Sequence, residues 1–327
     1  MNITGFDVDI VGLYSGFKLN RNTDFELVLR LSADGGLPVL SLKIYIPLIS
    51  NILQIRKGNK IDILLEDSTI PFEIINIKTD GAVVDLLALY DNVDYIRVRR
   101  QSSHPQVPGT QAVFNVTQSS DIRVNSTESQ TWLQTGQTDK EFVIDTLLRC
   151  DYNGEVPFLY YSPYTGLRVS TYDYEKTQNN VHKLGRSRGE ISFKYDIVSL
   201  PYLYAQAPIS QIGVSSSDLS TNYSDADNSG AIGNSIINSG NVHDSYYSSL
   251  INNIQALSRI EEQLLKIDIA RPSFIIEPGS PVIFSSFGNV DGESIPDLVG
   301  QSKLVTTTEF NITSKRVAMT LFVPRFS

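Results

Sequence analysis

The sequence predicts a mainly β protein with an α+β insert: two similar small antiparallel β-barrels, one inserted α+β domain and one long helix. Three observations support this fold class. Apolar and polar residues alternate with period two over short segments in the first and last parts of the chain, which is typical of half-buried strands. One order of turns and strands occurs twice. Helical periodicity stands out in two stretches that lie among the strands.

The repeated order joins the end of the chain to a stretch near its front. In residues 274–326, the turn Glu277-Pro278-Gly279 precedes a strand, a polar loop, a second strand, a tight turn and a third strand. In residues 52–90, the turn Arg56-Lys57-Gly58 precedes the same series. The residues do not align closely, so the repetition lies in the order of elements. We interpret it as one β module used twice.

Strand spacing and composition suggest three domains. In the first, residues 25–32 and 39–46 alternate clearly, and five or six strands at short spacing indicate a small antiparallel barrel or sandwich. Residues 101–109 are rich in Ser, Gln and Pro and are expected to form a linker. The predicted domains are a first β-barrel domain at 1–104, an inserted α+β domain at 105–185, and a second β-barrel domain at 186–327 that includes a polar loop at 213–245 and a helix at 246–266.

The clearest helix signal lies in the insert. Thr138-Asp139-Lys140-Glu141 fits a capping box, in which the Thr hydroxyl accepts from a free backbone N–H and the Glu side chain returns the bond. Apolar residues then follow at helical spacing until Asn153-Gly154, which is a helix stop. Two aromatic segments beyond it, 156–161 and 167–172, are expected to be strands. The sequence therefore predicts a small α+β unit.

Two sets of residues are candidate subunit contacts. Four apolar residues lie on one stripe of the predicted long helix, and this stripe is either core packing or a subunit contact: Leu250, Ile254, Leu257 and Leu264. Three cations cluster at a predicted strand end and form either an interface contact or a solvated edge that guards against strand pairing: Arg97, Arg99 and Arg100.

Composition narrows the function classes. The chain has 41 % hydrophobic and 19 % charged residues, a formal charge of −9 and a pI of about 4.9. The net negative charge and the absence of a Lys/Arg block argue against a nucleic-acid-binding surface, because such a surface needs clustered cations. The single Cys150 excludes an internal disulfide framework, and we expect it to be a buried thiol. We expect no secretory signal and no membrane-spanning segment, because no apolar run is long enough.

Motifs that carry chemistry are weak. The Gly-x-Ser-x-Gly pattern at 185–189 lacks the strand–turn–helix context of a hydrolase and is better interpreted as a Gly-rich basic turn. Residues 225–230 open like a calcium loop, but Ile236 stands where a bidentate Glu is required. Trp132 and three tyrosines could form a sugar platform, although ordinary packing is the simpler use: Tyr160, Tyr161 and Tyr164. The sequence predicts no catalytic, cofactor-binding or metal-binding residue, no cofactor and no enzymatic activity.

Two segments resemble phage tail hub proteins. The order Gln137-Thr138-Asp139, capped helix, Gly, aromatic strand, turn and Leu-x-Val strand ending at Tyr172 resembles the inserted domain of that family. A helix at 250–265, Pro278-Gly279 with Val282, and two final strands ending at Arg325 are similar to its second barrel. The family includes baseplate hubs of contractile-tailed phages, late-control gene D proteins and the hub portion of type VI secretion spikes. The resemblance covers most of the chain and depends on the order of elements more than on identities.

The resemblance implies a structural virion protein at the phage tail tip or baseplate, made in the host cytoplasm. Three subunits with two barrels each would give six, so a homotrimer would adapt the sixfold tail tube to a threefold central spike. The implied partners are the tail tube protein and the spike protein, with the tape measure protein and baseplate wedge proteins as further candidates. DNA would pass through the channel without specific binding. Two alternatives stay open: a carbohydrate-binding or peptidoglycan-directed tail module, and an adaptor ring with a single partner.

Overall fold

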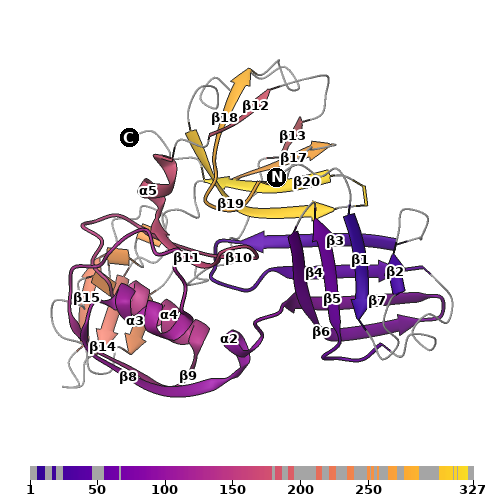
Figure 1. Ribbon diagram of the computed structural model, residues 1–327. Coiled ribbons are helices and arrows are strands. Elements are labelled where there is room, and N and C mark those ends of the chain that lie inside the picture. The colour runs from indigo at the N-terminus through magenta and orange to yellow at the C-terminus, as the bar shows by residue number, and fades with distance from the viewer. Residues whose placement is uncertain are drawn as a thin grey trace.

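A computed structural model gives the architecture of the chain (Figure 1). The structure describes these residues: 6–11, 17–19, 25–45, 55–65, 68–178, 181–185, 191–194, 211–215, 221–225, 234–238, 249–250, 252–253, 256–257, 264–270, 276–286, 302–311, 313–314 and 316–322. Within these ranges the protein is mainly β with a few short helices.

Two groups of strands flank an insert. The first module comprises β1 (Phe6–Val11), β2 (Phe17–Leu19), β3 (Phe25–Ser32), β4 (Val39–Ile44), β5 (Lys60–Leu65), β6 (Ser68–Asp80) and β7 (Val83–Tyr90). The second comprises β12 (His182–Gly185), β13 (Ile191–Lys194), β17 (Leu264–Ala270), β18 (Pro281–Ser286), β19 (Ser302–Asn311) and β20 (Arg316–Phe322). A separate three-stranded sheet contains β14 (Gln211–Ser215), β15 (Thr221–Asp225) and β16 (Asn234–Asn238).

The alternating patterns form strands with one buried face. Leu27, Leu29 and Leu31 of β3 are fully buried, whereas Glu26 and Arg30 of the same strand are exposed. This is the pleat geometry of a sheet that covers a core on one side. The buried sides of both modules and of the insert join in a single hydrophobic cluster.

All thirteen strands of the two modules belong to one sheet. Its order is β13-β17-β20-β19-β3-β4-β7-β6-β5-β1-β2, with β18 on β19 and β12 on β18. The expectation of two barrels is therefore wrong for the described residues, because no strand path among them closes on itself. The physical reason is the antiparallel pairing of β19 with β3, which joins the two modules edge to edge.

The insert packs two helices on a two-stranded ribbon. Its elements are α2 (Asp94–Arg97), β8 (Arg99–Val107), α3 (Gly109–Thr117), β9 (Gln130–Thr138), α4 (Asp139–Leu148), β10 (Pro157–Ser162), β11 (Gly166–Thr171) and α5 (Tyr172–Lys176). In Figure 1, α3 and α4 lie against the β8–β9 ribbon, away from the strands of the first module. The polar run expected to be a linker is mostly strand β8, because its residues pair with β9 and turn their polar side chains to solvent.

The capping box is confirmed and the long helix is not. The Thr138 hydroxyl accepts from the Glu141 N–H at 3.2 Å, and the Glu141 carboxylate accepts from the Thr138 N–H at 2.8 Å. Leu264 lies in strand β17, so the expected helix cannot continue to residue 266. Helical backbone is described only in short pieces between residues 249 and 257. Leu264 stands beside the period-two series Leu265, Ile267 and Ile269, and the pairing of this whole segment with β20 makes it a strand.

Candidate assembly site

The two modules share one turn geometry. In the first, Gly58 donates its N–H to the Ile74 carbonyl at 2.8 Å, and Ile74 donates to the Asn59 carbonyl at 2.9 Å. In the second, Gly279 donates to the Val305 carbonyl at 2.8 Å, and Val305 donates to the carbonyl of the residue after Gly279 at 3.1 Å. Both glycines have a positive φ, +87° and +82°, a conformation that glycine adopts without steric cost.

The match continues through the strands. A register shift separates Ile74 from Asn76 in β6, and an equivalent shift separates Val305 from Thr307 in β19. β7 then pairs with β4, as β20 pairs with β17. β4 pairs with β3, as β17 pairs with β13. The expected repeat is therefore present as five equivalent strands: β3 with β13, β4 with β17, β5 with β18, β6 with β19 and β7 with β20.

The outer strand of the modules differs. β1 runs antiparallel to β5, whereas β12 runs parallel to β18. One core position also differs, because the register that places Phe72 opposite Ile61 places Lys303 opposite Val282. Both Phe72 and Lys303 are fully buried. The strand order is thus duplicated, whereas the outer strand and individual core residues differ between the two modules.

The junction of the modules is a continuous strand pair. β19 pairs with β18 over its first residues and then with β3, from Thr307 opposite Ser32 to Asn311 opposite Val28. Ala33 donates its N–H to the Thr306 carbonyl at 2.8 Å, which extends the pairing past the end of β3. Glu309 lies directly opposite Arg30 on the exposed face, an opposite-charge cross-strand pair.

Two edges that correspond to this junction have no described partner. β5 covers β6 only as far as residue 73, so the edge of β6 from Asn76 to Asp80 pairs with no described strand on that side. β13 pairs with β17 alone among the described strands and stands at one end of the sheet. Unpaired N–H and C=O groups on such edges are templates for another strand. We call these two segments, Asn76–Asp80 and Ile191–Lys194, the free edges.

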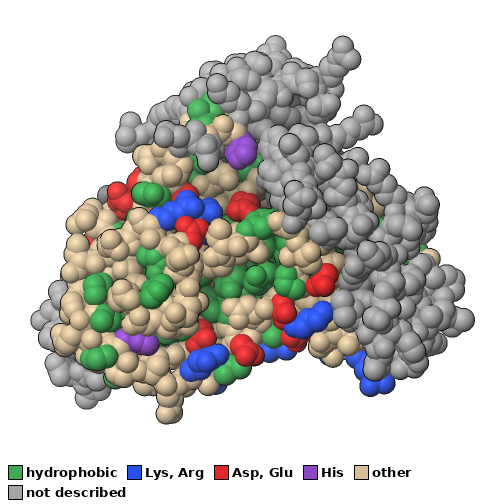
Figure 2. Space-filling model, viewed as in Figure 1, with side chains coloured by type: hydrophobic (Ala, Val, Ile, Leu, Met, Phe, Trp, Pro, Cys, Tyr) green, Lys and Arg blue, Asp and Glu red, His purple; other side chains and the backbone are tan. Residues whose placement is uncertain are grey.

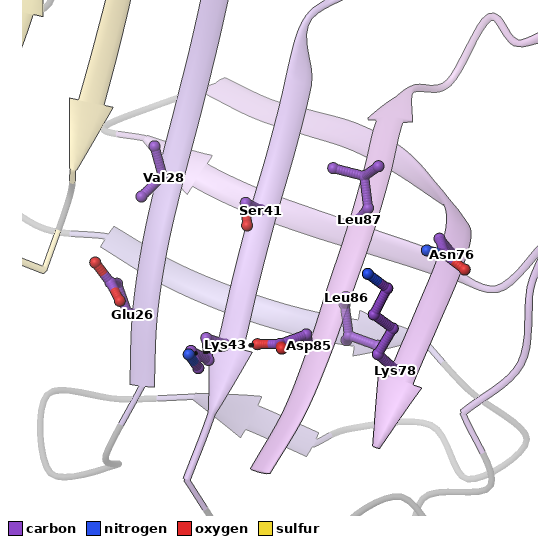
Figure 3. A pocket seen from close by; sticks show the side chains of 9 residues that line it. All are labelled: Glu26, Val28, Ser41, Lys43, Asn76, Lys78, Asp85, Leu86 and Leu87. Atoms are coloured by element: carbon purple, nitrogen blue, oxygen red, sulfur yellow. Dashed lines mark ion pairs between the residues drawn. The ribbon is translucent and has the colours of Figure 1, made fainter. Parts of the chain in front are cut away.

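A shallow groove crosses the exposed face of the first module. It has a volume of about 440 Å³ and is bordered by side chains from four strands: Glu26, Val28, Ser41, Lys43, Asn76, Lys78, Asp85, Leu86 and Leu87. Figure 3 shows Lys43 and Asp85 pointing toward each other across β4 and β7, at 3.9 Å. Two carboxylates and two ammonium groups border the groove, so it presents no field of one sign.

The β10–β11 hairpin wedges between the modules. Every residue of β10 is buried. Tyr161 accepts a hydrogen bond from the Asn92 side chain at 2.6 Å and lies against the rings of Tyr90 and Tyr95. Leu159 lies under the β3–β4 turn at Gly35, and Phe158 packs against the second-module turn at Gly279. The insert therefore fixes both modules.

A partly buried ion network lies beside the hairpin. Arg123 bonds Asp121 at 2.7 Å and Glu175 at 3.2 Å, and Arg168 bonds Asp121 at 2.9 Å. Burial would raise the pKa of Asp121, but hydrogen bonds from both guanidinium groups outweigh it and lower the pKa. Burial raises the pKa of nearby Glu277, and Arg168 opposes that rise only in part. Asp121 and Glu175 thus share Arg123, and Asp121 also binds Arg168, so the network links three segments of the insert.

The sequence-predicted contact residues are placed as follows. Leu250 and Leu257 are buried within the chain itself, at 2 % and 3 % exposure, and Ile254 lies outside the described residues. Arg97 pairs with Glu73 at 3.2 Å. The other two cations are also engaged: Arg99 bonds the Gly136 carbonyl at 3.0 Å and Arg100 pairs with Asp139 at 3.2 Å. Their roles between subunits stay predictions.

Residues considered for chemistry do not converge. Trp132 is buried and donates to the Val107 carbonyl at 3.0 Å, and Tyr160 and Tyr161 are buried too, which favours packing over a sugar platform. Cys150 is buried, as expected. The residues that follow Gly185 and Asp225 in the two weak motifs lie outside the described ranges.

The described part of the chain has neither a metal cluster nor a membrane helix. No group of three His, Cys, Asp or Glu side chains there could hold a metal ion. No helix there is long and apolar enough to span a membrane. On the face shown in Figure 2, acidic and basic side chains are interspersed.

The comparisons with known proteins identify the fold. No protein-family model and no curated protein matches the sequence. Among solved structures, the 43 kDa tail protein of prophage MuSo2 from Shewanella oneidensis has a TM-score of 0.64 at 11 % identity, over 97 % of each chain. The tail protein from Neisseria meningitidis MC58 has a TM-score of 0.63 at 10 % identity, over 97 % of this chain and 96 % of that one.

A third structure comes from a secretion system. The E. coli c3393 protein, a component of the type VI secretion system with structural similarity to the T4 tail proteins gp27 and gp5, has a TM-score of 0.52 at 13 % identity. The match covers 97 % of this chain and 77 % of that one. The chain therefore has the fold of phage tail proteins over nearly its full length, and the resemblance to the tail hub family is confirmed at the level of fold.

Proposed function

We propose that this chain is a structural protein of the phage tail tip or baseplate: a trimeric hub that adapts a sixfold tail tube to a threefold central spike and leaves a channel for DNA ejection. The observation that carries the proposal is the duplicated five-strand module whose two copies pair edge to edge through β3 and β19. One chain thereby supplies two equivalent ring positions, and three chains supply six.

Geometry explains why such a duplication suits an adaptor. A head-to-tail contact that repeats by a rotation dividing a full turn closes into a ring. With two modules per chain, the side of the ring that contacts the tube presents six similar units. Each chain has one insert, which lies between its two modules. The side of the ring opposite the tube would therefore present three inserts. The wedge of β10 between the modules keeps their relation fixed.

The charges fit a channel that DNA passes without sticking. A nucleic-acid grip needs a field of cations along the phosphates. The chain carries a formal charge of −9, and the groove on the first module combines two acids with two bases. The tail fold of the compared structures supports a structural rather than a catalytic role. The virion is the corresponding location.

Stoichiometry with the partners tests this function. The chain is co-expressed with the tail tube protein and the spike protein of the same genome, and the purified complex is weighed by native mass spectrometry. We expect three copies of this chain for three spike chains and six tube subunits in one terminal ring. A complex with equal numbers of this chain and tube subunits would overturn the adaptor role.

A further inference from the structure

Helix α3 and most of the β8–β9 ribbon lack charged residues. Residues 101–120 and 129–138 contain no Asp, Glu, Lys or Arg, although 19 % of the chain is charged. In Figure 2 the lower left of the molecule, over α3 and the ribbon, shows mostly uncharged and hydrophobic atoms. Charged side chains commonly protect exposed strands from association with other chains. This part of the insert lacks that protection.

The ribbon exposes one of the two charge-free faces. Along β9 the side chains alternate, so that Trp132 and Gln134 are buried, whereas Leu133 between them is 57 % exposed. No other large hydrophobic side chain among the described residues is as exposed as Leu133. Its neighbours on the same face are exposed and uncharged: Gln101, Ser103, Thr131 and Thr135. We call Leu133 and these four residues the ribbon face.

Helix α3 exposes the second face. Gln111, Phe114, Asn115 and Gln118 are exposed and recur at helical spacing, so they lie on one side of α3. The Gln111 side chain donates to the Asn115 side-chain oxygen at 3.0 Å, and the Gln118 side chain donates to the Asn115 carbonyl at 2.9 Å. These bonds hold the amides around Phe114, which is 37 % exposed. We call these four residues the helix face.

The two faces point in different directions. Ala112 and Val113 are fully buried on the opposite side of α3, which packs against α4 and the ribbon. The helix face therefore points away from the ribbon, and the ribbon face points away from the helices. One insert thus presents two separate surfaces, each with a large hydrophobic side chain among uncharged polar groups.

We propose that the ribbon face of one subunit packs on the helix face of a second copy of this chain, with Leu133 against Phe114. The inference rests on the proposed function and names a contact between its subunits. Two different faces on each insert are what a head-to-tail contact requires, because each subunit gives one face and receives the other. Repetition by a threefold rotation closes a ring of three inserts.

Charge favours a second copy as the occupant. Each copy has a formal charge of −9, so repulsion opposes most approaches between two copies. Repulsion is weakest where neither surface is charged, and a buried unpaired charge would be costly. The cores of protein contacts are accordingly depleted in charged residues. The cations at the end of the ribbon are already engaged: Arg99 bonds the Gly136 carbonyl, and Arg100 pairs with Asp139.

Single charges on the two faces test the contact. Leu133→Glu and, in a separate variant, Phe114→Glu would each bury an unpaired carboxylate, so each should weaken association of the full chain at least about tenfold in sedimentation velocity. The control is Tyr174→Glu, which adds the same charge on α5 at a side chain that is also 37 % exposed, and it should leave association unchanged. Circular dichroism checks the fold of each variant, and Leu133→Glu decides if Phe114→Glu does not fold.

Cysteine crosslinking tests the head-to-tail arrangement. A chain that carries both Leu133→Cys and Phe114→Cys, treated with a short bismaleimide, should give covalent dimers and trimers on a denaturing gel. Either single variant should give none, because it supplies a cysteine on only one of the two faces. The native Cys150 is buried and does not react.

The outcomes separate this inference from the proposed function. A trimer that withstands both face charges and gives no crosslink overturns the contact and leaves the hub role standing. Crosslinks with Leu133→Cys alone would show a symmetric ribbon–ribbon contact and would also overturn it. Loss of spike binding from intact trimers of the charge variants would assign the faces to the spike protein instead.

Two further results concern both proposals together. A protein that stays monomeric at its highest soluble concentration, with and without the spike protein, overturns the contact and the hub role. Weaker association of Leu133→Glu and Phe114→Glu, with crosslinks confined to the double cysteine variant, supports both.

Discussion

The two modules share a frame and differ in what covers it. The turn at Gly58 is exposed, and a Cβ atom there would meet nothing within 4 Å. The equivalent turn at Gly279 lies under the insert, where a Cβ would come within 3.1 Å of Phe158 and 3.2 Å of Glu175. The two turns therefore share the same backbone geometry, but the insert packs against the turn of the second module and leaves the turn of the first module exposed.

The contact of the insert with the first module predicts the largest effect on the free energy of unfolding. Gly35 has a φ of +64°, and a Cβ there would lie 2.3 Å from the Leu159 side chain. Gly35→Ala combines the cost of a left-handed backbone with overpacking, so we expect a loss of about 3 kcal/mol in the free energy of unfolding. Gly81→Ala, at φ +57° with open space, should lose only about 1 kcal/mol. Urea titrations of both variants measure the difference, and equal losses would refute the wedge.

The second module predicts the next effect through its equivalent turns. Gly279→Ala should cost about 2 kcal/mol, since backbone strain adds to contact with Phe158 and Glu175. Gly58→Ala should cost about 1 kcal/mol from the backbone alone. Thermal unfolding of the pair checks this. If Gly58→Ala were the more damaging change, the described packing of the second turn would be wrong.

The pH dependence of stability also distinguishes the second-module turn, which contains Glu277, from its exposed equivalent in the first module. Burial raises the pKa of Glu277 above its usual 4.5, so the folded state binds its proton more tightly than the unfolded state. The stabilisation from this group is complete at low pH and is lost as the pH rises through the raised pKa. Glu277→Gln should remove that loss, so the variant gains stability over the wild type at neutral pH and not at pH 4. Tm values from pH 4 to 8 measure it.

The matched control for Glu277 is Arg56→Gln, which changes the equivalent residue of the exposed turn. Its Tm should differ from that of the wild type by a constant amount over the same pH range. A larger gain for Glu277→Gln at pH 4 than at pH 8 would contradict a raised pKa of this carboxyl in the folded state.

The groove predicts the smallest effect. Lys43 and Asp85 are 3.9 Å apart, and their side chains are 41 % and 52 % exposed. Exposed pairs of this kind contribute little. Lys43→Ala should change the free energy of unfolding by less than about 0.5 kcal/mol. A loss above about 1 kcal/mol would show that the pair holds β4 against β7.

Local signals in the sequence were sufficient for some elements. The capping box at Thr138 and Glu141 formed as predicted, because its bonds join residues three apart. The alternation of β3 and the repeated turn order were also reliable, since each depends on neighbouring residues. The spacing of Leu264 from Leu250 and Leu257 suits a helical stripe, and the long-range pairing with β20 places it in a strand instead.

Long-range pairing could not be predicted. Nothing in the alternation of β3 indicates that its second edge meets β19, so the sequence predicts two barrels where the described strands form one joined sheet. The free edge at Asn76–Asp80 was missed for the same reason. The signal that could have revealed it is the matching register shift in the two repeats, which requires the strand pairs to be known.

The mass of the purified protein by light scattering, paired with top-view electron micrographs, tests the central claim most directly. We predict three times the chain mass and a ring of six similar lobes around a channel. A compact monomer with no ring at any concentration, and none after addition of the spike protein, would contradict the trimeric hub.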